Sequence, residues 1–298
     1  MNNKHGKYYY GKPEVGQFDH VIDAFVAHES VHSVKTSSLP LVQFWHDESI
    51  MRNVKQIKGA DGLTGEELRK IQNIFLEKDS LRCFEYATCV QGGRGKASMT
   101  DLMLLTKGSN RNYKIAIEAK FTEYQEDPQY RPTVKMWKSE KSCKSEKSSK
   151  KDGGQNREKV LEGWCNYITG NGGELDFSNI DEIPYQLVHR IASACAKDED
   201  DNAHIPIVLY HLFYEKDDEE NVNRFQNNLK GWVEKLALKG VGFYVLKSMI
   251  KINDSVFTAK EEGKRLNDLF RDMNKCGYCK VIQSDLCCIC SIPQANDD

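Results

Sequence analysis

The sequence predicts an α/β fold with a mixed central sheet and flanking helices. Segments of alternating polarity, typical of strands, stand between segments whose apolar residues recur every three or four positions, which is typical of amphipathic helices. The chain has 298 residues, of which 39% are hydrophobic. This length is enough to bury the core of one large domain or two small ones.

The composition excludes several classes of protein. The formal net charge of −2 excludes a uniformly basic protein that coats DNA, although it leaves room for a local basic groove. No apolar run approaches the roughly 18 residues of a membrane span. The first ten residues also lack the apolar region of a secretory signal. We therefore expect a cytoplasmic protein without a membrane partner, whose ten cysteines are reduced.

The first elements are helical in pattern. Residues 1–60 are predicted to form a helical extension, because the apolar residues of segment 18–28 have helical spacing. A clearer helix ends near Asp79, and Thr64 and Glu67 form the capping-box pattern at its start. Its buried stripe is predicted to consist of Leu68, Ile71, Ile74 and Phe75.

Three strands are predicted next. Residues 81–87 and 113–121 alternate in polarity, whereas residues 101–106 are apolar on both faces, as in the interior of a sheet. A short turn-forming segment joins the second and third strands. We therefore expect these two strands to form an antiparallel hairpin in which Thr106 lies opposite Tyr113.

A lysine recurs at every third position between residues 135 and 151, and serines fill most of the gaps. A period of three fits neither a helix nor a strand, so residues 135–155 are predicted to be a flexible basic loop. Two interpretations stay open: the loop follows a nucleic-acid backbone, or it is a solvated insertion.

The second half of the chain alternates helices and strands, which completes the prediction of an α/β fold. We expect three regions, namely the extension over 1–60, a core over 61–215, and a C-terminal α/β extension with a cysteine-rich tail over 216–298. The remaining elements are predicted to be a helix ending at Gly170, a helix from Pro184 to about Ala196, a strand over 205–214, a helix over 221–238, a strand over 241–252, a helix over 259–273 and a hairpin-like tail.

Charged side chains converge in the predicted hairpin. If Thr106 lies opposite Tyr113, Asp101 lies opposite Glu118, and their Cβ atoms are about 4.5–5.5 Å apart on one face. Lys120 lies on the same face, because side chains alternate along a strand. Two ionised carboxylates at this distance repel each other, and Mg²⁺ relieves the repulsion by taking carboxylate oxygens as ligands. A lysine beside them can act on a water molecule or a phosphate, so the cluster suits phosphodiester hydrolysis.

The order Asp101, sixteen intervening residues and Glu118-Ala119-Lys120 resembles the motif of the PD-(D/E)XK nuclease superfamily. That superfamily includes type II restriction enzymes, RecB-type nuclease domains and Holliday-junction resolvases. The resemblance covers roughly residues 60–215 and implies a restriction-endonuclease-like αβββαβ core. It also implies that Asp101 and Glu118 hold Mg²⁺ or Mn²⁺, that the Ala119 carbonyl is a further metal ligand, and that Lys120 acts on the attacking water.

The acid-x-lysine pattern occurs a second time in the chain, so the sequence around each copy decides which one resembles the family motif. The triplet 262–264 has the same acid-x-lysine pattern in a polar helical stretch, without a strand around it. Thr100 stands where the family has proline, at a position that varies widely within the family. The alternative interpretation of Glu118 and Lys120 is a salt bridge on a surface hairpin.

Further charged residues are candidates near this cluster. Glu85 is predicted to lie on the face opposite Phe84 and Tyr86, either as a third acid of the site or as a surface glutamate. Arg94 and Lys96 lie in a glycine-rich loop, where cations and backbone N–H groups can bind the phosphates of a nucleic acid. The alternative for this loop is a solvated connection.

The helix that begins at Pro184 carries a polar stripe that includes Gln186, His189 and Arg190. RecB-type nucleases place a glutamine-bearing helix beside the catalytic face, so the resemblance implies that these three residues contact nucleic acid. The downstream tyrosine of that family is Arg190 here. In the alternative interpretation, His189 and Arg190 cap the helix or pair with acidic segments.

Two CxxC pairs, separated by seven residues, are formed by Cys276, Cys279, Cys287 and Cys290. Four thiolates can hold a structural zinc ion. Some RecB-type nucleases hold an iron–sulfur cluster on C-terminal cysteines and one upstream cysteine, for which Cys83 and Cys89 are candidates here. The third interpretation is that the tail cysteines are plain buried thiols.

These patterns together predict a Mg²⁺-dependent endonuclease that acts on DNA and works alone or as a homodimer. By analogy with the family, a nuclease of this size without a helicase or ATPase motif indicates bacterial restriction or phage defence. Two alternatives stay open. One is a non-catalytic nucleic-acid-binding protein with a nuclease-like fold, and the other is a protein whose C-terminal metal site is the functional part.

Overall fold

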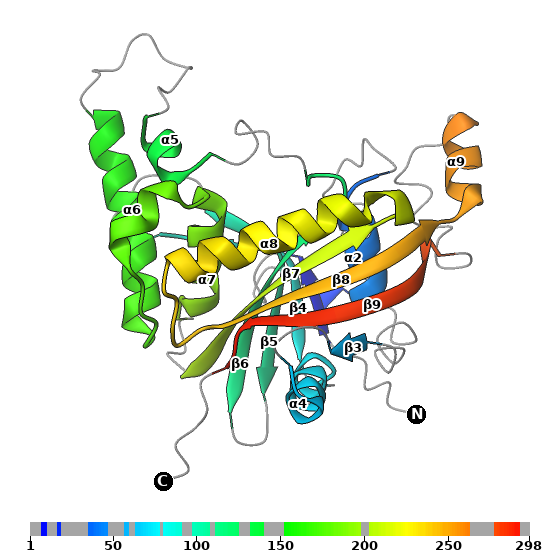
Figure 1. Cartoon of the computed structure of the whole chain (residues 1–298), viewed down its shortest axis with the longest axis horizontal. Coiled ribbons are helices and arrows are strands. Elements are labelled where there is room, and N and C mark those ends of the chain that lie inside the picture. The colour runs from blue at the N-terminus through cyan, green and yellow to red at the C-terminus, as the bar shows by residue number, and fades with distance from the viewer. Residues whose placement is uncertain are drawn as a thin grey trace.

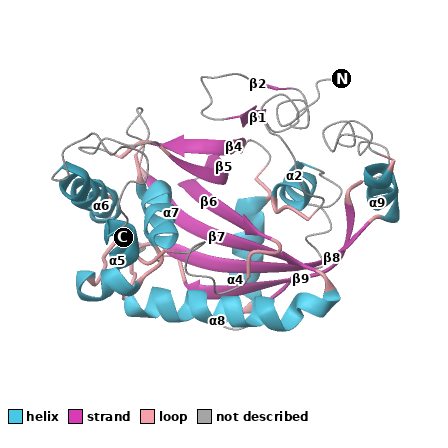
Figure 2. Ribbon diagram, turned by 90° about the horizontal axis from the view of Figure 1, so that it is seen from above, coloured by secondary structure: helices cyan, strands magenta, loops and turns pink. Residues whose placement is uncertain are grey.

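One mixed sheet runs through the molecule, and helices pack against both of its faces (Figures 1 and 2). The computed structural model describes residues 7–10, 17–18, 35–46, 57–59, 63–77, 80–90, 97–107, 111–124, 132–139, 152–197, 203–262 and 277–292. Within these residues the sheet has nine strands in the order β2-β1-β4-β5-β6-β7-β8-β9-β3.

The strands of the sheet run in both directions. From β4 to β6 neighbouring strands are antiparallel, from β6 to β8 they are parallel, and β9 is antiparallel to β8. The mixed sheet of the predicted α/β fold is therefore confirmed. The strands are β1 Lys7–Tyr10, β2 Gln17–Phe18, β3 Ile57–Gly59, β4 Leu81–Thr88, β5 Ser98–Lys107, β6 Asn112–Lys120, β7 His204–Tyr214, β8 Gly242–Ile252 and β9 Cys279–Cys290.

The helices divide between two layers, because successive strand residues face opposite sides of the sheet. In β6, Ile115 and Ile117 enter the core beneath the first layer, whereas Ala116 enters the core beneath the second. The first layer consists of α2 Ser38–His46, α4 Gly65–Phe75 and α9 Asp254–Glu261. The second layer consists of α5 Val134–Ser139, α6 Asp152–Gly170, α7 Tyr185–Cys195 and α8 Glu219–Lys235, with the 3-10 helices η2 Phe177–Glu182 and η3 Lys216–Asp218 in its connections.

Several local predictions are confirmed. Thr106 pairs with Tyr113 in the β5–β6 hairpin, which is the expected register. The Thr64 side chain accepts a hydrogen bond from the Glu67 backbone N–H, and the Glu67 carboxylate accepts one from the Thr64 N–H, so the capping box is present. The polar helix after Pro184 is α7.

Other predictions need correction. The three expected regions share one sheet, because residues 1–60 contribute β1, β2 and β3, and residues 216–298 contribute β8 and β9. The expected loop over 135–155 is partly helical, since it overlaps α5 and the start of α6. The cysteine-rich tail is the single strand β9 rather than a hairpin. The helix expected over 259–273 overlaps α9, which begins at Asp254 and ends at Glu261, and residues 263–273 lie outside the described part of the chain.

The predicted helix over 18–28 lies outside the described residues, apart from Phe18, which ends β2. What the structure does describe of the N-terminal region includes α2, which packs into the core of the first layer. Phe44 and Trp45 of this helix are both buried there. The N-terminal region therefore contributes to the main core.

A buried chain of polar side chains crosses the first layer. The Trp45 indole N–H donates to Nδ1 of His211 at 3.1 Å, and Nε2 of His211 lies 2.9 Å from the Ser248 hydroxyl. Ser248 in turn lies 2.8 Å from the Ser284 hydroxyl. Because an indole can only donate, Nδ1 must be unprotonated, and burial lowers the pKa of His211 accordingly. The chain ties α2 to β7, β8 and β9.

We expect Thr64→Ala to lower the free energy of unfolding by about 1 kcal/mol, because it removes the side-chain cap of α4. Urea denaturation followed by circular dichroism would measure this change. Thr258→Ala is the matched control, since Thr258 is an exposed threonine inside α9. An equal loss in both variants would contradict a specific capping effect.

We expect His211→Leu to lower the free energy of unfolding by roughly 1–3 kcal/mol, because it leaves the Trp45 N–H without an acceptor in the core, whereas Ser248 keeps Ser284 as a partner. The double variant with Trp45→Phe removes one orphaned donor as well. Its loss is therefore expected to be smaller than the sum of the two single losses. Strict additivity in urea denaturation would show that the hydrogen bond carries no net coupling.

Candidate active site

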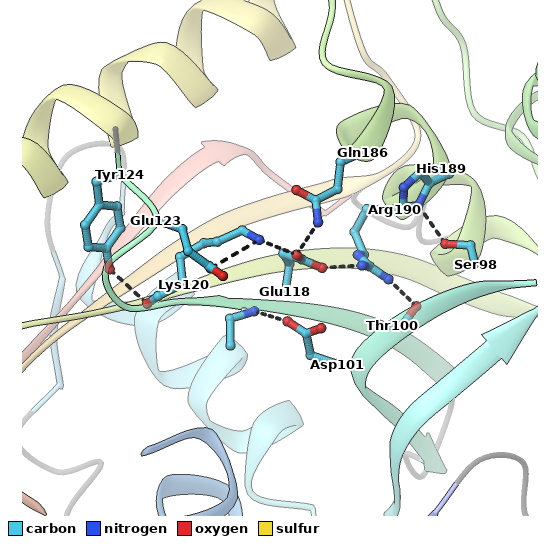
Figure 3. Close-up of polar contacts among 11 residues, drawn as sticks. Ser98, Thr100, Asp101, Glu118, Lys120, Glu123, Tyr124, Gln186, His189 and Arg190 are labelled. Atoms are coloured by element: carbon cyan, nitrogen blue, oxygen red, sulfur yellow. Dashed lines mark hydrogen bonds and ion pairs between the residues drawn. The ribbon is translucent and has the colours of Figure 1, made fainter. Parts of the chain in front are cut away.

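The candidate site lies where the pairing of β5 and β6 opens. The regular pairs run from Lys107–Asn112 to Leu102–Ile117. At the next position, the Asp101 carboxylate Oδ2 accepts a hydrogen bond of 2.7 Å from the backbone N–H of Ala119 (Figure 3). The side chain of Asp101 thus takes the place of a backbone partner. The predicted neighbourhood of Asp101 and Glu118 is confirmed by this register.

The neighbouring strand β4 is irregular at the same level. Phe84 belongs to the core of the first layer and Tyr86 to the core of the second, so the alternation of faces breaks between them. Glu85 has a φ of +50°, a left-handed conformation that costs a non-glycine residue roughly 1–2 kcal/mol. The expectation that Glu85 points away from both Phe84 and Tyr86 is therefore wrong. Its register position is opposite Asp101, and its role as a third acid stays a prediction.

The Glu118 carboxylate is the centre of the cluster. Its Oε1 accepts from the Lys120 ammonium at 2.8 Å and from the Gln186 amide at 2.6 Å. Its Oε2 forms an ion pair with Nη2 of Arg190. Glu118 and Arg190 are each about 1% exposed, so this ion pair is shielded from water. The side chain expected to hold a metal ion is held by two cations and an amide.

Helix α7 supplies two of these partners from above the sheet (Figure 3). It packs on β5, β6 and β7. Two side-chain hydrogen bonds hold it there, one from Arg190 and one to its C-terminal end. Nη1 of Arg190 donates to the Thr100 hydroxyl at 2.6 Å. Farther along β6, the buried Lys114 ammonium donates to the carbonyl of Ala196, which caps the C-terminus of α7. A cation there also interacts favourably with the helix dipole.

The two carboxylates of the site differ in acidity. Desolvation and the negative charge of Glu118 raise the pKa of the Asp101 carboxyl to about 7, although Arg190 and Lys120 act in the opposite direction. Burial works to raise the pKa of Glu118 too, but the adjacent Arg190 and Lys120 outweigh it and leave that pKa lowered. Glu118 is therefore the ionised member of the pair, and Asp101 exchanges its proton near neutral pH.

The two cations stay protonated. Burial works to lower the pKa of Lys120, but Glu118 and Glu123 outweigh it and raise this pKa above its ordinary value. The same balance raises the pKa of Arg190, where Glu118 is the main favourable charge. With Asp101 ionised, the four charges of Asp101, Glu118, Lys120 and Arg190 cancel.

His189 has a different environment from the one expected. Its Nδ1 lies 2.7 Å from the Ser98 hydroxyl, and its ring packs beside the aromatic rings of Trp164 and Tyr185. Burial and the nearby Arg190 charge lower the pKa of His189 to about 3, so the imidazole is neutral. Gln186, His189 and Arg190 all form contacts within the protein, and their predicted contact with nucleic acid stays a proposal.

The predicted cysteine site does not fit the observed strand. Cys279 and Cys287 lie eight residues apart on β9, a separation of roughly 26 Å along an extended strand. Four ligands of one zinc ion lie within a few ångströms of each other, so these cysteines cannot share one tetrahedral site. Cys83 is on β4, five strands from β9, or roughly 24 Å away. An iron–sulfur cluster that joins Cys83 to the tail does not fit either.

Three predicted residues lie outside the described part of the chain. They are Arg94, Lys96 and Cys276. Among the described residues, no group of three histidine, cysteine, aspartate or glutamate side chains gathers as a metal site would require. Any metal ion at the described carboxylates would therefore have at most two carboxylate ligands.

The donor set of Asp101 and Glu118 still fits a divalent cation with water ligands. Asp101 is partly exposed, and within the described residues its Oδ1 makes no hydrogen bond. Asp101 and Glu118 both lie where the β5–β6 pairing opens, and the charge of Glu118 raises the pKa of the Asp101 carboxyl. Lys120, Gln186 and Arg190 take three of the roughly four lone-pair sites of the Glu118 carboxylate, so a metal ion would compete with Arg190 at Oε2. Mg²⁺ commonly uses one or two carboxylates and keeps several waters.

Comparison with protein families identifies a match over most of the chain. Residues 16–242 match the family described as Domain of unknown function (DUF6946). The chain belongs to this family. The comparisons with curated proteins and with solved structures found no match. In the described part of this DUF6946 protein, none of the helices combines the length and the apolar character needed to cross a membrane.

Sequence reasoning missed three contacts that position the site in this DUF6946 protein. Thr100 accepts from Arg190, Ser98 contacts His189, and the Tyr124 hydroxyl donates to the carbonyl of Lys120 at 2.8 Å. The first two come from the start of β5, which the pattern placed at Asp101 because Ser98–Thr100 lack alternation. The contact of Tyr124 is made by a residue after β6, where no periodic signal exists.

We expect Asp101→Asn to stabilise the metal-free protein at pH 8. The folded-state pKa of Asp101 lies above the ordinary value, so the folded protein holds the proton more tightly than the unfolded chain does. The free energy of unfolding therefore falls as pH rises from about 4 to about 7, by roughly 2–4 kcal/mol. An amide avoids this loss and can still accept from the Ala119 N–H.

Urea denaturation in EDTA at pH 5 and pH 8 would test this expectation. Asp217→Asn controls for the loss of one carboxylate, because Asp217 is exposed in η3. If Asp101→Asn and the wild type lose equal stability between the two pH values, Asp101 does not bind its proton more tightly in the folded state.

Proposed function

We propose that this DUF6946 protein is a metal-dependent nuclease that hydrolyses phosphodiester bonds in DNA. The observation that carries the proposal is the position of Asp101 and Glu118 at the opened end of the β5–β6 hairpin, with the Lys120 ammonium 2.8 Å from Glu118. Two close carboxylates beside a cation suit the binding of a divalent metal and a phosphate.

The order of elements also supports the proposal. A helix, three antiparallel strands, further helices and a strand parallel to the third strand follow each other as α4, β4, β5, β6, α5 to α7 and β7. This is the order that the resemblance to PD-(D/E)XK nucleases implies for residues 60–215. Glu118 and Lys120 lie at the end of β6, which is central in the sheet and pairs with β7 there.

The chain's own residues take distinct roles in this proposal. Oδ1 of Asp101, one oxygen of Glu118 and the Ala119 carbonyl would hold Mg²⁺ or Mn²⁺. A bound divalent ion supplies a lower pKa for a coordinated water and charge for the developing oxyanions. Gln186 holds Glu118 through its amide. The role of Glu85 as a third acid and the contacts of Arg94 and Lys96 with phosphates remain parts of the proposal.

Lys120 acts as a cation in this proposal rather than as a base. Its raised pKa keeps it protonated at neutral pH, so it can donate hydrogen bonds but cannot accept the proton of the attacking water. Lys120 would therefore orient the water or the scissile phosphate. The carbonyl of Lys120 is fixed by Tyr124, which holds this end of β6 in place.

One observation favours a second candidate function. Arg190 and Lys120 already neutralise Glu118 and Asp101 without a metal ion. A protein that keeps a nuclease-like fold and only binds nucleic acid would have a cluster of this kind, in which the charges balance without a metal ion. Homodimer formation and a place in restriction or phage defence belong to the proposal by family resemblance alone.

We expect the purified protein to cut DNA in Mg²⁺ or Mn²⁺ but not in EDTA, and Asp101→Ala to lose this activity. Plasmid, linear and single-stranded DNA would serve as substrates in a gel-based cleavage assay. Lys120→Ala is expected to cut at least 100-fold more slowly, because an oriented charged group typically contributes that much. DNA binding measured in Ca²⁺ or EDTA is expected to persist in this variant.

Lys264→Ala is the matched control, because triplet 262–264 has the same sequence pattern outside the β5–β6 hairpin. It is expected to cut as the wild type does. DNA binding without cutting by any form would favour the binding protein. Cutting that survives in Asp101→Ala would reject the proposed site.

A further inference from the structure

The ion pair between Arg190 and Glu118 lies at the carboxylate oxygen that has the fewer partners. Oε1 of Glu118 has two partners, Lys120 and Gln186, whereas Oε2 has the ion pair with Arg190. Arg190 also donates to Thr100, the residue before Asp101 on β5, so its guanidinium lies beside the strand that carries the second carboxylate. A cation that approaches Oε2 of Glu118 therefore competes with Arg190.

Arg190 has donor capacity that its present contacts leave unused. Its Nη1 donates to Thr100 and its Nη2 pairs with Glu118, but its buried Nε has no hydrogen-bond partner among the described residues. A guanidinium has five N–H donors in a planar fork that suits two oxygens of a phosphate. Arg190 can therefore turn from a carboxylate to a phosphodiester without losing its main type of contact.

A buried charge that loses its partner is costly. If a divalent ion took Oε2 of Glu118, Arg190, which is about 1% exposed, would be left without its counter-ion. A phosphodiester anion beside Arg190 would remove this cost. Displacement of Arg190 from Glu118 would then favour binding of the phosphodiester, and binding of the phosphodiester would favour this displacement.

We propose that Arg190 is an exchangeable counter-ion: a divalent metal displaces it from Glu118, and the freed guanidinium binds a phosphodiester of the substrate. This inference rests on the proposed nuclease function and deepens it. Metal and phosphodiester then bind with positive cooperativity, because each relieves the electrostatic penalty of the other. Arg190 competes with the metal in the absence of substrate and binds the phosphodiester in its presence.

The test compares metal binding by the metal-free wild type, Arg190→Met and Arg69→Met. Methionine keeps much of the length of the side chain and removes the charge. Arg69 is an exposed arginine of α4, in the helical layer across the sheet, so it controls for the loss of one positive charge. The dissociation constant of Mn²⁺ would be measured by the electron paramagnetic resonance of free Mn²⁺, with and without dimethyl phosphate.

Arg190→Met is expected to bind Mn²⁺ about fivefold or more tightly than the wild type, which is the lower end of common coupling strengths. Arg69→Met is expected to match the wild type. Dimethyl phosphate, a phosphodiester monoanion, is expected to tighten Mn²⁺ binding by the wild type but not by Arg190→Met. Equal or weaker Mn²⁺ binding by Arg190→Met, or an equal phosphate response in both proteins, would overturn the exchange.

Failure of this inference differs from failure of the proposed function. If the wild type cuts DNA but Arg190→Met binds Mn²⁺ no more tightly than the wild type does, only the exchange is rejected. A wild type that neither binds Mn²⁺ nor cuts DNA rejects both. If Arg190→Met does not fold, the test uses the wild type and measures the guanidinium NMR signals of Arg190. These signals are assigned by comparison with Arg190→Lys. They are expected to shift on Mg²⁺ saturation, and unchanged signals would overturn the exchange.

Discussion

The contact of Glu118 with Arg190 is the interaction on which the arrangement of the site depends. It joins the central strand β6 to α7 through a fully buried ion pair, and Gln186 reinforces it from the same helix. Isolated buried charges are costly, so both partners must be in place before α7 can pack closely on the sheet. The contacts of Thr100 and Ser98 with this helix extend the same connection to β5.

Strand β6 separates two tasks by the alternation of its side chains. Its odd-numbered residues, such as Ile115 and Ile117, fill the core under α2 and α4. Its even-numbered residues face α7 and include Lys114, Glu118 and Lys120. A change of charge on one face therefore leaves the packing of the other face largely untouched. The hydrophobic side provides the rigidity that a buried charged cluster requires.

The sequence predicted the centre of the site well because it is governed by local rules. The turn between β5 and β6 sets the register, and the register places Asp101 near Glu118. The partners from α7 depend on packing between elements 68 or more residues apart, which spacing alone cannot determine. The break of alternation at Glu85 and the continuous strand β9 that carries Cys279 and Cys287 are likewise set by neighbouring strands.

The parallel pairing of β6 with β7 has a consequence for folding. Parallel neighbours need a long crossover, which in this chain carries α5, α6 and α7 between the two strands. Contacts that close such long loops form slowly, because the chain must lose much entropy before they form. The hairpin of β5 and β6 can form early, but Glu118 gains its helical partners only when the crossover has docked. A nascent chain therefore passes through a stage in which both acids are present but remain solvated and unassembled.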